Sequence, residues 1–179
     1  MTATNFITSA QRTIKMEADA VAELQQRLDH SFVTACETML ACEGRVIVTG
    51  MGKSGHIGNK IAATLASTGT PSFFVHPGEA SHGDLGMITK NDVVIAISNS
   101  GNTAEVVTIL PLIKRLDIPM ISMTGNPDSV LSQAALANLD VSVASEACPL
   151  NLAPTTSTTV TLAMGDALAI ALLESRGFT

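Results

Sequence analysis

Apolar residues recur at every third or fourth position along the beginning of the chain. The stripe consists of Ile7, Ala10, Ile14, Ala18, Val21, Leu24 and Leu28. This spacing places the stripe on one face of an α-helix. Residues 31–43 continue as a second, shorter helix, with Ser31 as its candidate N-cap. The pattern therefore predicts an N-terminal helical hairpin over residues 1–44.

From residue 45 onward, short apolar runs alternate with helical patterns. The runs predict strands at 45–50, 71–77, 92–100, 119–125 and 140–145. The helical patterns lie at 55–67, 103–116, 128–137 and 156–176. Runs that are apolar throughout indicate strands covered on both faces, and intervening helices imply right-handed crossovers and a parallel sheet. We expect a three-layer αβα sandwich with a five-stranded parallel sheet of flavodoxin-like order 2-1-3-4-5, in one domain spanning 1–179 with its core at 45–179.

Composition and charge narrow the class of protein. Apolar residues make up 46% of the chain and charged residues 15%, which is typical of a folded protein. The net charge of −6 argues against a nucleic-acid partner. No uninterrupted apolar run reaches the ~18 residues of a membrane span, and charges interrupt the region where a signal peptide would be apolar. We expect a cytoplasmic protein without a membrane partner.

The segment "VIVTGMGKSGHIGNK" at 46–60 matches parts of two nucleotide-binding motifs. Its Gly-Lys-Ser resembles the end of a nucleoside-triphosphate loop, but that motif requires glycine where Ile47 stands. Its Gly-x-Gly-x-x-Gly has the spacing of a dinucleotide-binding turn, which also expects an acidic residue about 20 positions further on. The sequence has His76 there. Both motifs share an anion-binding helix N-terminus, and this is the feature we retain.

Two loops then predict a phosphate site. In the first, Gly52 opens a helix, Ser54 offers a hydroxyl and Lys53 a positive charge. In the second, a polar cluster consisting of Ser98, Asn99, Ser100 and Thr103 surrounds Gly101. A tight turn and a simple helix cap are the alternatives, but a cap needs only one hydroxyl. Neighbouring parallel strands would bring the two loops together around one phosphate.

The pattern Ser-x-Ser-Gly-x-Thr at 98–103, after Gly-x-Gly-x-Ser, resembles the sugar isomerase (SIS) family over roughly 45 to 177. The longer stretches "GMGKSGHIGNKIAATLASTGTPSFFVHPGEASHGDLGMI" and "VIAISNSGNTAE" are most similar to family members that isomerise D-arabinose 5-phosphate. The resemblance implies an aldose–ketose isomerase that interconverts D-ribulose 5-phosphate and D-arabinose 5-phosphate through an enediol(ate), toward Kdo and lipopolysaccharide. It further implies tandem CBS domains after the isomerase domain. A proton-transfer route requires no cofactor. The apolar stripe of the first helix exceeds what one small sheet needs, so we expect a homo-oligomer through it, arranged as a dimer of dimers as in the family.

Proton transfer between two carbons requires a base within reach of both. Glu146, in a loop before the last helix, is the preferred base, and Glu105 is the second candidate because a first-turn acid also has a structural role. The resemblance supports both residues. It also assigns His82 to ring opening or enediolate stabilisation, and a histidine there could bind adventitious zinc. Lys53 is the electrostatic partner of the enediolate or phosphate.

Two further interpretations stay open. In "PTTSTT" at 154–159, the hydroxyls are expected to cap the last helix, with Thr155 and Ser157 as additional ligand contacts. A non-catalytic phosphosugar sensor would share every phosphate-binding residue and would lack only the base. No pattern of cysteines or histidines has the spacing of a functional metal site, and the three cysteines include no C-x-x-C pair.

Overall fold

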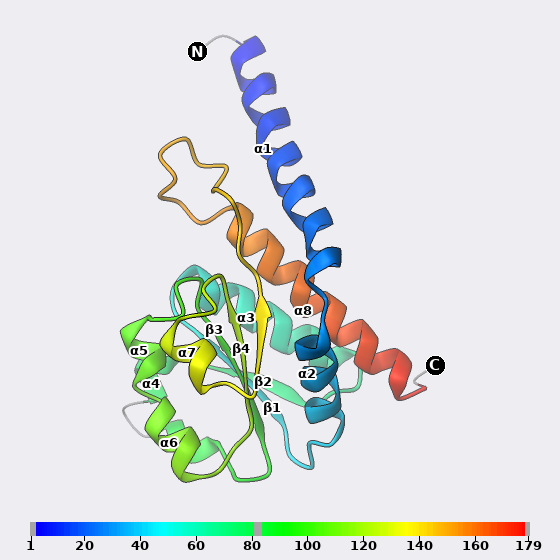
Figure 1. The fold of residues 1–179 in the computed structure, drawn as a ribbon, viewed down its shortest axis with the longest axis vertical. Coiled ribbons are helices and arrows are strands. Elements are labelled where there is room, and N and C mark those ends of the chain that lie inside the picture. Colours follow the sequence, from blue (N-terminus) through cyan, green and yellow to red (C-terminus); the bar gives the residue numbers. More distant parts are fainter. Residues whose placement is uncertain (1–2, 81–83, 178–179) are drawn as a thin grey trace.

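The chain folds into a parallel sheet between two layers of helices (Figure 1). The fold is described from a computed structural model, which covers residues 3–80 and 84–177. The strands are β1 (Val46–Gly50), β2 (Ser72–Val75), β3 (Val93–Ile97), β4 (Met120–Thr124) and β5 (Ala137–Asp140). The helices are α1 (Ala3–Glu23), α2 (His30–Leu40), α3 (Lys53–Ser67), α4 (Pro77–Ala80), α5 (Ala104–Val107), α6 (Leu110–Arg115), α7 (Val130–Ala134) and α8 (Thr156–Ser175), with 3-10 turns η1 (Leu24–Arg27) and η2 (Asp84–Met87).

The sheet has the order β2-β1-β3-β4-β5, and every neighbouring pair is parallel. The predicted architecture and strand order are therefore confirmed. In the central pair, Thr49 of β1 is in register with Ala96 of β3. Because β1 and β3 are neighbours, the loops after Gly50 and Ile97 leave the sheet side by side. Their junction is the switch point at which ligands bind in such sheets.

The two faces of the sheet bury separate apolar clusters. Val48 and Ile95 pack on one side with residues of α2, α3 and α8, such as Leu168. Ile47 and Val94 pack on the other side with residues of α5, α6 and α7. The strands β1, β3 and β4 have five residues each, and every one of these residues is buried. This two-sided burial explains why the strands read as continuous apolar runs and not as alternating ones.

The cap of α2 and the helix expected over 103–116 differ from the sequence prediction. Ser31 is not the N-cap of α2, because Asp29 holds that position and its carboxylate accepts the backbone N–H of Ser31 at 2.8 Å. The single helix expected over 103–116 is divided into α5 and α6. Pro111, at the start of α6, has no N–H to continue the hydrogen-bond ladder of α5, so the helix breaks there.

The last strand was predicted at 140–145, so its start was wrong by three residues and its end by five. β5 begins at Ala137 and not at residue 140, and the preceding helix α7 is correspondingly shorter. The final ladder bond runs from Val141 N–H to Thr124 O, at 3.0 Å. β4 ends at Thr124, so residues 141–145 have no neighbouring strand with which to pair. They continue instead as a loop toward α8.

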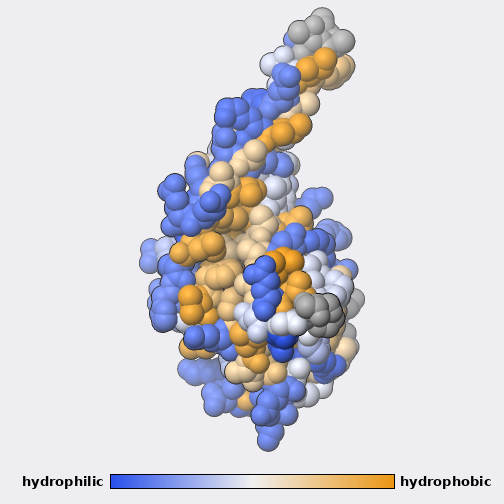
Figure 2. Space-filling model, turned by 90° about the vertical axis from the view of Figure 1, so that its right-hand side faces the viewer, coloured by the Kyte–Doolittle hydropathy of each residue, from blue (hydrophilic) through white to orange (hydrophobic). Residues whose placement is uncertain are grey.

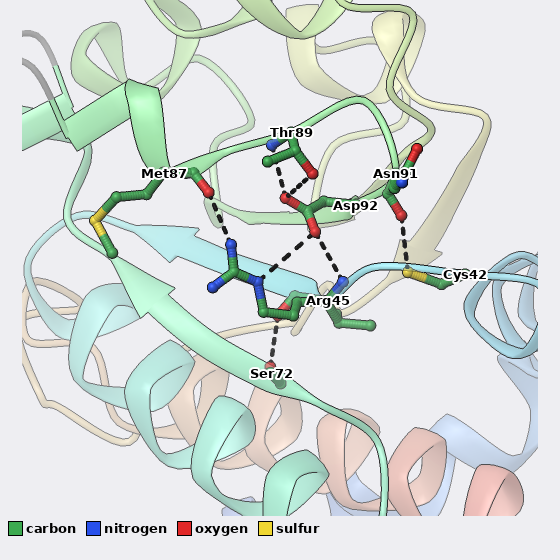
Figure 3. Close-up of polar contacts among 8 residues, drawn as sticks. Cys42, Arg45, Ser72, Met87, Thr89, Asn91 and Asp92 are labelled. Carbon is green, nitrogen blue, oxygen red and sulfur yellow. Dashed lines mark hydrogen bonds and ion pairs between the residues drawn. The ribbon is translucent and has the colours of Figure 1, made fainter.

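A buried carboxylate ties together the amino ends of β1 and β3 (Figure 3). Asp92 accepts the backbone N–H of Arg45 at 2.8 Å and that of Thr89 at 2.7 Å. Arg45 in turn donates to Met87 O at 3.0 Å and stacks over the ring of Phe73. This polar cluster lies at the amino-terminal ends of the strands, whereas the switch point lies at their carboxyl ends. It therefore has a structural role, which is to fix the segment that leads into β3.

Helix α1 projects beyond the sandwich and keeps much of its apolar stripe in contact with solvent (Figures 1 and 2). Phe6 and Ile7 are each 60% exposed and Ile14 is 68% exposed. The C-terminal part of the stripe is covered, since Leu24 is buried. Thr159 of α8 donates to Glu17 of α1 at 2.9 Å, so α1 is fixed to the body along α8. The N-terminal part of the apolar stripe is therefore exposed in this chain.

Among the described residues, one helix, α8, is long and apolar enough to cross a membrane. Half of its apolar stretch is buried inside the protein. Its contacts are with α1, α2 and α3. The core helix of a soluble protein passes the same test, so α8 is only weak evidence for a membrane segment.

Candidate active site at the carboxyl ends of the strands

A cleft of about 150 Å³ lies where β1 and β3 end, between α3 and the start of α8. Its lining consists of Met51, Lys53, Ser54, Ile57, Asn99, Pro154, Ser157, Thr158 and Thr161. Three residues that the sequence singled out, Lys53, Ser54 and Asn99, therefore meet in one cleft. They come from the two loops that were expected to lie side by side.

The first loop ends in a helix N-terminus that opens onto the cleft. Gly52 occupies the N-cap of α3 with φ +58°, a conformation that glycine adopts without strain. A Cβ at this position would meet no atom within 4 Å, so the space beside the turn is open. The first turn of a helix carries N–H groups without intrahelical acceptors, and the adjacent Lys53 adds a positive charge. This arrangement suits an anionic group.

The second loop holds its hydroxyls together through a buried serine. Ser98 Oγ lies 2.8 Å from Thr103 Oγ1 and 3.4 Å from Ser100 Oγ, and accepts the N–H of Gly101 at 3.1 Å. Thr103 occupies the N-cap of α5 but makes no side-chain capping bond. The cluster is therefore more than a helix cap. Ser98 is its buried centre, while Asn99 and Ser100 are exposed.

Glu146 lies behind the cleft and closes the N-terminal end of α8. Its carboxylate accepts the backbone N–H groups of Thr155 at 2.8 Å and Ser157 at 3.2 Å. The hydroxyl groups of Thr155 and Ser157 donate to it as well. Burial acts to raise the pKa of Glu146, but the hydrogen bonds, led by that from the Ser157 side chain, outweigh it and lower the pKa below its ordinary value. Glu146 is thus held as a carboxylate.

The second candidate for the base, Glu105, is not brought into this cleft. Glu105 is exposed in the first turn of α5, in the helix layer opposite α8, and is not among the described residues that line the cleft. His82 lies outside the described residues. No group of three or more histidine, cysteine or acidic side chains that could hold a metal occurs within 3–80 and 84–177.

The sequence interpretation missed part of the wall that α8 contributes. Pro154, Thr158 and Thr161 line the cleft together with Ser157. Ser157, Thr158 and Thr161 lie on one face of α8, and Pro154 lies just before the helix begins. The hydroxyl residues within "PTTSTT", followed by Thr161, were the available signal. Helix starts commonly contain such residues, so the sequence favours a capping role for them.

Comparison with known proteins places this geometry in a family. Residues 39–171 match the SIS domain family, so the chain belongs to that family. The chain is 74% identical over 175 residues to arabinose 5-phosphate isomerase KdsD of Pseudomonas aeruginosa, covering 98% of this chain and 54% of the relative. It is 59% identical over 175 residues to KdsD of Escherichia coli K12, covering 98% and 53%. The chain thus spans about half the length of these curated relatives.

A solved structure supports the same placement. The fold superposes on Escherichia coli CFT073 c3406 in complex with arabinose 5-phosphate, with a TM-score of 0.96 and 46% identity. The match covers 100% of this chain and 95% of that one. A protein with this fold therefore binds arabinose 5-phosphate.

Proposed function

We propose that this chain is an aldose–ketose isomerase domain that interconverts D-ribulose 5-phosphate and D-arabinose 5-phosphate. The observation that carries the proposal is the cleft itself, where Lys53 and the N-terminus of α3 face Ser157, with the Glu146 carboxylate directly behind it. An anion site and a carboxylate base in this arrangement suit a phosphosugar. The names of the curated relatives support the same substrate pair.

The chemistry needs one base and one source of positive charge. The phosphate would sit at Gly52–Ser54 and the polar loop of Ser98 to Thr103, held by N–H groups and hydroxyls. Glu146 would remove the proton next to the carbonyl and return it to the neighbouring carbon, through an enediol(ate). Lys53 would stabilise the charge that develops on the enediolate oxygen. No step requires a redox cofactor.

Two residues keep supporting roles in the proposal. Glu105 is the second candidate for the base, and its exposure in a first turn leaves helix stabilisation as its other role. His82 remains the candidate for ring opening, on the strength of the family resemblance. Glu146 is preferred over Glu105 because its carboxylate contacts a residue of the cleft wall.

The proposed biological setting follows from the same resemblance. The product would feed the synthesis of Kdo for lipopolysaccharide, in the cytoplasm. The apolar stripe on α1 supports a homo-oligomer, because Phe6, Ile7 and Ile14 would otherwise remain in water. We propose a dimer of dimers, with α1 in one of its interfaces.

A non-catalytic phosphosugar sensor is the second candidate function. One observation favours it: the four donors on Glu146 lower its pKa and so weaken it as a base. The two functions share the phosphate site and differ only in turnover.

Proton NMR of the full chain with D-ribulose 5-phosphate separates the two functions. An isomerase forms D-arabinose 5-phosphate and, in deuterated water, incorporates deuterium at the exchanged carbon. Glu146→Gln is expected to abolish both signals. Binding of D-arabinose 5-phosphate without turnover by the unaltered protein would replace the isomerase proposal with the sensor.

A further inference from the structure

We propose that Ser157 is the positioning residue of Glu146: it holds Oε1 toward the cleft and makes Oε1 the oxygen that exchanges the substrate proton. This inference rests on the proposed isomerase function. It adds which oxygen of the base reacts and which side chain fixes it.

The two oxygens of the Glu146 carboxylate have different surroundings. Oε2 accepts three hydrogen bonds, from Thr155 N–H at 2.8 Å, Thr155 Oγ1 at 3.1 Å and Ser157 N–H at 3.2 Å. A carboxylate oxygen offers about two lone-pair sites, so these donors occupy Oε2 fully. Oε1 accepts the hydroxyl of Ser157, and the described part of the chain supplies it with no second donor. One lone pair of Oε1 therefore remains available for a proton.

Ser157 links this carboxylate to the cleft wall, because it lines the cleft and its hydroxyl donates to Oε1. It is the second residue of α8, is only 4% exposed, and belongs to the cleft wall opposite Lys53. Glu146 itself is not among the described residues that form that wall. The side chain of Ser157, which lines the cleft, binds Oε1, whereas only the backbone N–H of Ser157 binds Oε2. Oε2 points to the backbone at the end of the helix.

The reaction needs such a fixed orientation. The C–H bond next to the carbonyl breaks, its electron pair enters the enediolate, and the proton moves to Oε1. The proton of the neighbouring hydroxyl passes to the former carbonyl oxygen, and Oε1 returns its own proton to the former carbonyl carbon, so the enzyme ends unchanged. A carboxylate free to rotate would present either oxygen at a varying distance, and a displacement of about 1 Å can cost roughly 100-fold in rate. The Ser157 hydroxyl restricts this rotation.

A purely structural role makes a different prediction. The capping of α8 depends on backbone N–H groups that bind Oε2, and Ser157→Ala retains both of them. If Glu146 served only as a cap, this substitution would leave catalysis unchanged. If Ser157 orients the base, kcat falls while the substrate phosphate remains bound.

The test is the pH dependence of kcat and kcat/KM for Ser157→Ala in the full chain. We expect kcat to fall roughly 10- to 100-fold with KM little changed. The acid limb of kcat/KM is expected to move to higher pH, because a donor that lowers the pKa of Glu146 has been removed. Ser157→Thr keeps the hydroxyl and should restore both properties.

Thr158→Val provides the matched control. Thr158 belongs to the same cleft wall, but its hydroxyl donates to Thr155 O at 2.7 Å and not to Glu146. The acid limb of kcat/KM for Thr158→Val should lie at the same pH as in the unaltered protein. A Ser157→Ala variant with unaltered kcat and acid limb would overturn the inference.

A second measurement does not depend on turnover. Carbon-13 NMR of the labelled Glu146 carboxyl should give a higher pKa in Ser157→Ala than in the unaltered protein, and equal pKa values would also refute the inference. Ser157→Cys, a weaker donor of similar size, serves if the alanine variant fails to fold. Absence of turnover in the unaltered protein would contradict the proposed function instead, so the two failures are distinct.

Discussion

Gly101 is packed so closely against Ser129 that the side chain of Ser129 occupies the space a Cβ on Gly101 would need. The glycine also has φ +66° and donates its N–H to Ser98 Oγ at 3.1 Å. Its carbonyl accepts the N–H of Leu131 at 3.0 Å. The polar loop of the candidate phosphate site is therefore built directly onto the start of α7.

Gly101→Ala is expected to disrupt both stability and phosphosugar binding. The substitution combines an unfavourable backbone conformation with an overlap at buried Ser129, which together cost roughly 2–4 kcal/mol of unfolding free energy. Urea denaturation and isothermal calorimetry measure the two effects. Gly86→Ala is the control, since a Cβ there meets no atom within 4 Å. Equal losses in the two variants would contradict this account of Gly101.

Ser100→Ala is expected to weaken phosphosugar binding without destabilising the fold. Ser100 is exposed, and its hydroxyl accepts the N–H of Asn102 at 3.2 Å, so its removal leaves the buried Ser98 centre in place. Loss of one hydrogen bond to a charged phosphate costs about 1.5–3 kcal/mol, or roughly 10-fold or more in Kd. Calorimetry with D-arabinose 5-phosphate measures this, with Ser67→Ala at the far end of α3 as control. An unchanged Kd would remove Ser100 from the phosphate site.

Much of this fold was predictable because its strands and helices carry local signals. The buried strands read as apolar runs, and the glycine turn at Gly52 marked the start of α3. The boundaries that failed have different causes, since the Asp29 cap and Pro111 are local and only the end of β5 depends on a tertiary contact. β5 is defined by where β4 ends, and Asp29 precedes α2 as its cap although Ser31 has an equally suitable side chain.

The candidate site was predictable only in part. Lys53, Ser54 and Asn99 follow strands whose order was correctly inferred, so their meeting in one cleft could be foreseen. The bonds between Glu146 and Thr155 join residues nine positions apart across an irregular loop. No periodicity describes such a loop, and its geometry depends on the packing of α8. The roles proposed for Glu105 and His82 stay predictions.

Glu146→Gln is expected to lower stability at neutral pH and to lose this effect in acid. The pKa of Glu146 is lowered in the folded state, so its contribution is fully present above the ordinary glutamate pKa of about 4.3 and is lost as pH falls through the folded-state pKa. At pH 7 the variant should lose about 1 kcal/mol, as when a helix cap is removed.

Urea denaturation at pH 7 and near pH 3 tests whether the stabilisation by Glu146 is lost in acid. The difference between the unaltered protein and Glu146→Gln should shrink at the lower pH, because protonation removes the same charge-assisted bonds. Glu43→Gln, at an exposed site, should show little difference at either pH. A difference for Glu146→Gln that grew in acid would contradict the lowered pKa.

The three cysteines are expected to differ in reactivity. Backbone N–H groups of Ala153 and Leu152, together with others in that loop, lower the pKa of Cys148, whereas burial raises the pKa of Cys36 and of Cys42. The thiolate is the reactive form, so iodoacetamide should label Cys148 first at pH 7. Mass spectrometry of digested protein after timed labelling would show this order. Faster labelling of Cys36 would contradict the described loop geometry.

Ile14→Asp is expected to dissociate the proposed homo-oligomer without unfolding the protein. Ile14 is 68% exposed on the apolar stripe of α1, so a carboxylate there remains hydrated in the isolated chain. In an interface the same carboxylate would be buried without a partner, which strongly opposes association. Light scattering should therefore report a smaller assembly with an unchanged circular dichroism spectrum. Asn5→Asp, about 180° around the helix from Ile14, adds charge on the opposite face and should leave the assembly intact. An unchanged mass for Ile14→Asp would place the interface elsewhere.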